Sequence, residues 1–173
     1  MTNHASVTLL PDAGPLITLA YADALDLLPK SGWSIALVDM VLHEVTRNET
    51  PTSARIAAWA RDSRIPVLET TIYQRYMQAA MGSTVRKANL GELAIQEAMS
   101  GFGLAADQTG VFLFEDHKIA RTSFLLPENC RKVSTRAFLL FMEEQGLIDS
   151  SAEIERRAIL AGRQFSQIRF PPE

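Results

Sequence analysis

Four acidic residues of this chain are placed where they could act together on a metal ion. Asp12 and Asp116 follow short apolar runs, and Glu44 and Glu92 lie in segments with helical periodicity. Two carboxylates about 6 Å apart, at an effective dielectric of about 20, repel by roughly 3 kcal/mol, so four together need a cation or raised pKa values. Carboxylate oxygens suit Mg²⁺ or Mn²⁺, and such ions support the hydrolysis of phosphodiesters.

The first of these acids lies between a predicted strand and a predicted helix. Residues 7–10 are an apolar, β-rich run that ends at Pro11, and the Ala-Gly-Pro sequence after Asp12 predicts a turn into a helix. Open α/β sheets bind ligands at the carboxyl ends of their strands. Asp12 is therefore predicted at the edge of a sheet where ligands bind.

The remaining elements predict a parallel sheet. Further strands are expected at residues 35–38, 65–68, 110–114 and 130–134, and helices at 40–47, 54–61, 72–81, 89–99, 135–145 and from the capping box at Ser150 onward. Alternating strands and helices predict a three-layer α/β/α fold with a central, mainly parallel sheet. In such a sheet Asp116 reaches the same edge as Asp12.

Each acid also has a purely structural explanation. Asp12 is a good helix cap, and Glu44 suits a solvated helix face. Glu92 stands three residues after Asn89, as in a capping box, and Asp116 could simply end a strand and begin a helix.

The acid-containing segments resemble the motifs of PIN-domain nucleases. These segments are D-A-G-P-L-I-T-L-A at Asp12, V-L-H-E-V at Glu44, L-G-E-L-A-I at Glu92 and F-L-F-E-D-H-K-I-A-R at Asp116. They are most similar to the compact prokaryotic branch that includes VapC-like toxins, over about residues 7–147. The resemblance implies a PIN-like fold and a ribonuclease with all four acids as catalytic residues. Asp12, Glu92 and Asp116 would be the ligands of Mg²⁺ or Mn²⁺.

Other residues are candidates for contacts around this site. Members of the branch often carry two aspartates where this chain has Glu115 and Asp116, so Glu115 is expected beside the ligand set rather than in it. The resemblance implies that Thr135, a hydroxyl residue before the last core helix, contacts the substrate. Lys118 and Arg121, one helical turn apart, could bind phosphates, although a solvated helix face is the favoured explanation.

Composition sets the limits of these interpretations. The chain has 173 residues, a net charge of −3 and a single cysteine, Cys130, which excludes an internal disulfide framework and a multi-cysteine metal site. No apolar run approaches the roughly 18 to 20 residues of a membrane span, so a cytoplasmic protein without membrane contact is expected. We expect a PIN-like domain at residues 1–148 and a helical extension at 149–173 that packs on it.

The resulting hypothesis is a metal-dependent endoribonuclease that acts as the toxin of a toxin–antitoxin pair. RNA is the expected substrate, with a small antitoxin protein and a second copy of the chain as candidate partners. The alternative is a catalytically silent PIN-like scaffold that binds RNA or protein. An aspartyl-phosphate phosphatase is disfavoured because Gly14 stands where a second aspartate is required.

Overall fold

The computed structural model describes residues 6–80, 90–102, 107–115 and 126–163. Strands and helices alternate along most of this part of the chain. The elements are β1 (Ser6–Pro11), α1 (Ala13–Tyr21), α2 (Leu27–Lys30), β2 (Ser34–Ile35), β3 (Leu37–Val38), α3 (Asp39–Thr46), α4 (Ser53–Asp62), β4 (Val67–Leu68), α5 (Thr71–Ala80), α6 (Leu90–Phe102), β5 (Gln108–Phe114), β6 (Cys130–Ser134), α8 (Thr135–Glu144) and α9 (Ser151–Leu160).

The central sheet is parallel and has the strand order β2-β1-β5-β6. Its two middle strands lie in the core. Four of their apolar side chains are completely buried, namely Leu9, Leu10, Phe112 and Leu113. Strands covered on both faces need such continuous apolar runs. The pairing of β1 with β5 continues to Pro11 and Leu113, so both strands end at the same edge of the sheet.

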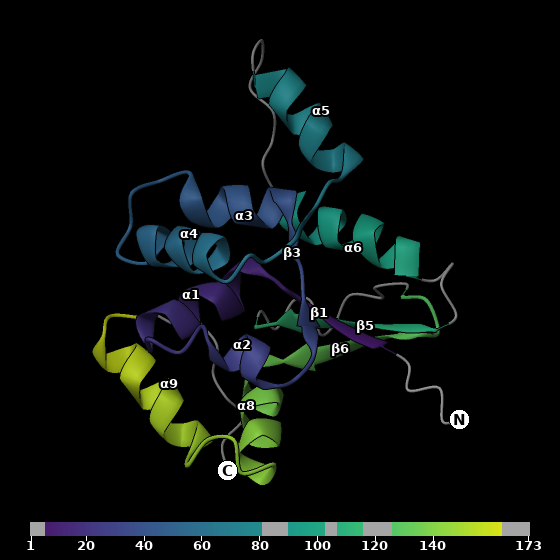
Figure 1. Cartoon of the computed structure of the whole chain (residues 1–173). Coiled ribbons are helices and arrows are strands. Elements are labelled where there is room, and N and C mark those ends of the chain that lie inside the picture. The colour runs from purple at the N-terminus through teal and green to yellow at the C-terminus, as the bar shows by residue number, and fades with distance from the viewer. Residues whose placement is uncertain (1–5, 81–89, 103–106, 116–125, 164–173) are drawn as a thin grey trace.

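Helices cover both faces of this sheet. In Figure 1, α3, α4 and α6 lie above the strands and α8 lies below them. Both α6 and α8 pack against β5, and α1 follows β1 directly. The predicted α/β fold with a central parallel sheet is confirmed.

One predicted strand is divided in two. The sequence predicts one strand over residues 35–38, but the strand with which the backbone forms hydrogen bonds changes after Ala36. The Ala36 N–H donates to the Leu9 carbonyl at 3.1 Å, whereas the Leu37 N–H donates to the Pro66 carbonyl at 2.9 Å. The second half therefore pairs with β4 in a separate two-stranded sheet. An apolar run in the sequence predicts that a strand is buried. It does not indicate which neighbouring strand forms the backbone hydrogen bonds with it.

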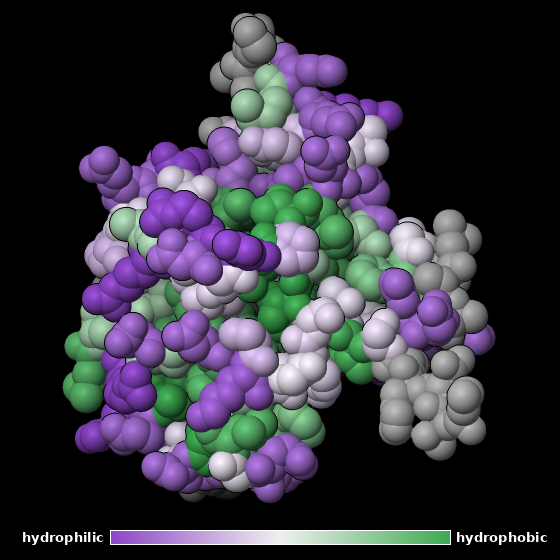
Figure 2. All heavy atoms as spheres, viewed as in Figure 1, coloured by the Kyte–Doolittle hydropathy of each residue, from purple (hydrophilic) through white to green (hydrophobic). Residues whose placement is uncertain are grey.

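The helix α9 packs on α1 and α8. It begins where the capping box predicts, because the Ser150 hydroxyl accepts a hydrogen bond from the Glu153 N–H at 3.3 Å. Ile154 and Ala158 point into the core. Figure 2 shows hydrophilic residues over much of the visible face, with hydrophobic ones gathered centrally and over the end of α9. No helix within the described ranges has the length and apolar character needed to cross a membrane.

Candidate functional site

Asp12 lies at the carboxyl end of β1 and at the N-cap position of α1. Its side chain makes no capping hydrogen bond to that helix. Its backbone N–H donates to the Leu113 carbonyl at 2.9 Å, which fixes Asp12 beside the end of β5. Capping therefore does not explain an aspartate here, where Asp12 is half-buried at the binding edge of the sheet.

Three of the four predicted acids line one small pocket at this edge. The pocket has a volume of about 210 Å³ and is lined by Asp12, Ala13, Glu44, Gly91 and Glu92. These residues come from the start of α1, from α3 and from the first turn of α6. We refer to this hollow as the acid pocket.

Glu44 is held against the first turn of α6. Its Oε1 accepts a hydrogen bond from the Gly91 N–H at 3.2 Å, and a Cβ at Gly91 would come within 2.7 Å of its Oε2. Glu44 is half-buried, so it is not a solvated helix residue. Glycine is the residue that allows the carboxylate to approach the helix so closely.

The electrostatics of the acid pocket favour a proton on Glu44. Burial raises the pKa of its carboxyl above the ordinary value of 4.5, and the neighbouring charge of Glu92 raises it further. The Gly91 N–H and the Arg47 guanidinium act in the opposite direction but do not cancel the effect of burial. In the metal-free protein these surroundings therefore disfavour the charged form of the Glu44 carboxyl.

The donor chemistry of the acid pocket suits a hard divalent cation, but its three described acids do not by themselves form a group that could hold one. Its three acids supply only oxygen donors, which suit Mg²⁺ and Mn²⁺. Within the described ranges, no group of three or more His, Cys, Asp or Glu side chains has an arrangement that could hold a metal ion. The fourth predicted acid, Asp116, lies outside these ranges, as do Lys118 and Arg121.

Thr135 is buried at the start of α8. Its hydroxyl donates to the Phe114 carbonyl at 3.4 Å, and the preceding Ser134 caps the helix by accepting from the Ala137 N–H. Thr135 thus lies at the carboxyl end of β5. Its contact with a substrate stays a prediction.

Glu115 follows β5 but belongs to a different cluster. Its carboxylate accepts hydrogen bonds from Thr18 and Arg163 and does not line the acid pocket. Glu115 therefore lies apart from the acid pocket, and its place relative to a set of metal ligands stays a prediction. The contribution of Arg163 was not anticipated, since nothing in the sequence connects it with residue 115.

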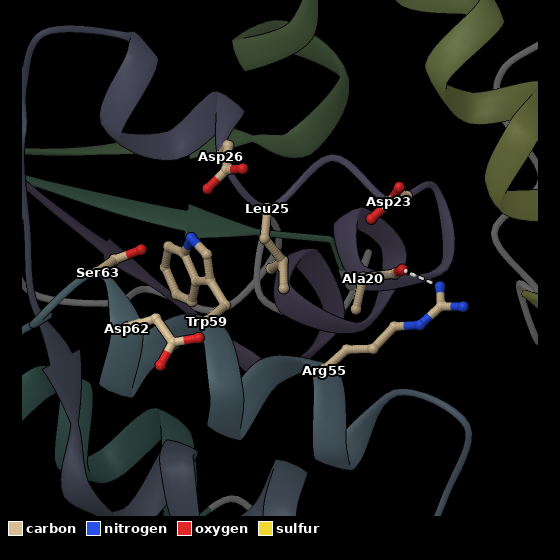
Figure 3. Close-up of a pocket in the computed structure, with 8 residues that line it drawn as sticks. All are labelled: Ala20, Asp23, Leu25, Asp26, Arg55, Trp59, Asp62 and Ser63. Carbon is tan, nitrogen blue, oxygen red and sulfur yellow. Dashed lines mark hydrogen bonds between the residues drawn. The ribbon is translucent and has the colours of Figure 1, made fainter.

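A larger pocket of about 470 Å³ lies at the end of α1, beside α4 (Figure 3). It is lined by Ala20, Asp23, Leu25, Asp26, Arg55, Trp59, Asp62 and Ser63. The Arg55 guanidinium there donates to the Ala20 carbonyl at 3.1 Å and so caps α1. None of the predicted site residues in the described ranges lines this pocket, so the acid pocket is the candidate site.

Gly91 lines the acid pocket, a role that its sequence motif does not indicate. A glycine in the first turn of a helix, next to an acid, was the available signal, because helix propensity alone favours alanine. Its importance depends on the approach of Glu44 from another helix, which the sequence does not reveal.

The fold is similar to that of a PIN domain of known structure. The structure matches the PIN domain of RRP44 from T. brucei with a TM-score of 0.50 and 14% identity, over 82% of this chain and 84% of that one. No family model matches the sequence, and no curated protein matches it. Identity this low shows the fold alone. The chain therefore has a PIN-like fold, as predicted, and its placement in the VapC-like branch stays a prediction.

Proposed function

We propose that this protein is a metal-dependent endoribonuclease. The observation that supports the proposal is the acid pocket, which Asp12, Glu44 and Glu92 line at the carboxyl edge of a PIN-like sheet. We assign catalytic roles to these residues and to Asp116, and the ligation of Mg²⁺ or Mn²⁺ to Asp12, Glu92 and Asp116. An ion bound there would activate water and stabilise the leaving oxygen.

The three acids of the acid pocket have different roles in the proposed reaction. Asp12 is held by the backbone of β5, so its carboxylate is presented from a rigid strand end. Glu92 lies in the first turn of α6, where a negative charge interacts favourably with the helix dipole. Glu44, whose pKa is raised by burial, accepts a proton more readily than an exposed glutamate does in the metal-free state.

The acid pocket favours an enzyme over a silent scaffold. Burial and Glu92 both oppose the charge of Glu44, so the acids cost stability when no cation is present. A protein that only binds partners has no physical need for such a group. RNA as the substrate, and a toxin role with a small antitoxin and a second copy of the chain as partners, rest on the sequence motifs.

Cleavage of RNA by an Asp12→Asn variant tests the proposal. The purified wild-type protein should cleave single-stranded RNA in Mn²⁺ or Mg²⁺ and not in EDTA. Asp12→Asn should lower the rate by at least about a hundredfold, because one change weakens ion binding and water activation together. The measurement is the initial rate on a labelled oligonucleotide.

The matched control is Asp107→Asn. Asp107 is exposed just before β5, at the opposite end of the strand from Asp12, and it has the same charge. This variant should cleave at the wild-type rate. Equal rates for Asp12→Asn and wild type would contradict the assignment, and binding of RNA without metal-dependent cleavage would establish the scaffold.

The toxin role has its own test. Expression of the wild-type chain in a bacterial host should arrest growth, whereas Asp12→Asn should not. Co-expression of a small protein encoded beside the gene should relieve the arrest. Normal growth with active wild-type enzyme would separate the ribonuclease from the toxin role.

A further inference from the structure

A closed cluster of three side chains lies at the carboxyl end of β5. The Thr18 hydroxyl is 2.9 and 2.8 Å from the two carboxylate oxygens of Glu115 and donates to them. Arg163 donates from Nη2 to Glu115 Oε2 at 3.1 Å and from Nε to Thr18 Oγ1 at 2.9 Å. The side chains of Arg163 and Glu115 are only 19% and 10% exposed, so this is a largely buried ion pair.

The cluster packs against the first turn of α1, close to Asp12. A Cβ at Gly14 would lie 3.0 Å from the Cβ of Glu115 and 3.1 Å from its Oε2, so Glu115 packs directly on the first turn of α1. Gly14 is two residues from Asp12, and the Asp12 N–H is bonded to Leu113, two residues before Glu115. The position of Glu115 is thus coupled to the position of Asp12.

Arg163 reaches the cluster from the C-terminal extension. It follows α9, and its backbone N–H donates to the Ala158 carbonyl at 2.9 Å. The helix is itself fixed to α1, because the Arg157 guanidinium donates to the Ala22 carbonyl. The location of Arg163 is therefore set by the docking of α9.

Loss of Arg163 would leave a buried carboxylate without its cation, which is costly. Glu115 could regain solvent only by moving, and it is packed on the turn that follows Asp12. We infer that Arg163 is a positioning residue of the acid pocket: through Glu115 it holds the end of β5 and the start of α1 so that Asp12 keeps its place. This role rests on the proposed function of that pocket.

The test measures Mn²⁺ affinity by calorimetry on full-length variants. Arg163→Met should weaken Mn²⁺ binding by about tenfold, the range typical of residues that orient ligands, and should lower kcat more than it changes KM. Arg163→Lys should restore part of the affinity. Adding Glu115→Gln to Arg163→Met removes the negative charge that has lost its partner. The double variant should therefore bind Mn²⁺ with an affinity within about threefold of wild type.

The matched control is Arg156→Met, which removes the same charge from the same extension. Arg156 pairs with Glu153 on the surface of α9, with side-chain exposures of 67% and 47%. It should bind Mn²⁺ like wild type. A double variant as weak as Arg163→Met, or an equal loss in Arg156→Met, would overturn the inference.

A second measurement separates this inference from the proposed function. If the wild-type protein takes up no Mn²⁺, the proposed function fails, and backbone amide chemical shifts decide the role of Arg163. Shifts at Asp12 and Gly14 in Arg163→Met, reversed when Glu115→Gln is added, would support positioning. Shifts confined to α9 would refute it.

Discussion

Glu44 shows how burial and contact set the properties of a single side chain. Its pKa is raised chiefly by burial, with a further contribution from Glu92. The folded protein therefore holds a proton on Glu44 at pH values where the unfolded chain has already released it. By linkage, the charge on Glu44 lowers the free energy of unfolding at pH values above the pKa that this carboxyl has in the folded state. This loss of stability disappears as the pH falls below 4.5, because the carboxyl is then protonated in the folded and the unfolded chain.

Glu44→Gln should consequently stabilise the metal-free protein at pH 7. We expect a gain on the order of 1 kcal/mol after solvent screening, since the glutamine oxygen can still accept from the Gly91 N–H. The gain should vanish below about pH 4, where the carboxyl is neutral in both states. Urea unfolding in EDTA at the two pH values measures it. Exposed Glu49→Gln is the control, and the idea fails if both variants respond alike.

The sequence could predict the acids of the pocket but not the direction of Glu115. Asp12, Glu44 and Glu92 each follow a strand or lie on a helix whose start is encoded locally. Glu115 also follows a strand, but its carboxylate pairs with Arg163. This pairing depends on the packing of α9, which is distant from Glu115 in the sequence. Local patterns carry no information about such a contact.

At the scale of elements, the start of α6 combines a helix terminus with the wall of the acid pocket. Gly91 and Gly101 lie near opposite ends of this helix. A Cβ at Gly101 would meet no atom within 4 Å, whereas one at Gly91 would displace the carboxylate of Glu44. The two glycines therefore differ in function although they share a helix.

Gly101→Ala should raise the free energy of unfolding by about 0.5 to 1 kcal/mol through helix propensity alone and leave Mn²⁺ binding unchanged. Gly91→Ala should gain less stability, because it breaks the contact with Glu44. It should also weaken Mn²⁺ binding by about tenfold. Calorimetry and urea unfolding of both variants give the comparison. Equal Mn²⁺ affinities would show that Glu44 does not depend on Gly91.

Element boundaries could be predicted to within a few residues where caps or glycines mark them. Residues 130–134 form the predicted strand, and Ser150 caps α9 as its motif indicates. The division between β2 and β3 was missed, because Ala36 is as apolar as its neighbours. Strand pairing is decided by tertiary hydrogen bonds, which hydrophobic pattern does not specify.

At the scale of the whole molecule, the extension shares the core of the domain. Ile154 is 7% exposed and belongs to the main cluster of buried side chains, whereas Ile159 on the same helix is 53% exposed. Trp33 stacks on Phe141 of α8, so its fluorescence reports on this side of the molecule. A single core predicts a single unfolding transition.

Ile154→Ala should lower the free energy of unfolding by about 2 to 4 kcal/mol, because it leaves a cavity between α9 and the domain. Ile159→Ala should change it by less than about 1 kcal/mol. Urea denaturation, followed by circular dichroism and by tryptophan fluorescence, provides both values. Two separate transitions, or equal effects of the two changes, would mean that α9 is not part of the cooperative unit.

The pairing of β1 with β5 has a consequence for how the chain acquires its structure during synthesis. The register joins Ser6 to Gln108, so the middle of the sheet cannot close until more than half of the chain has left the ribosome. Contacts so distant in sequence carry a large loop-closure cost and slow the folding of a domain. Until β5 emerges, β1 can pair only with β2, and α1 can pack only on earlier elements such as α3 and α4. Arg163 is synthesised later still. The ion pair between Arg163 and Glu115 can therefore form only after almost all of the described chain has been synthesised.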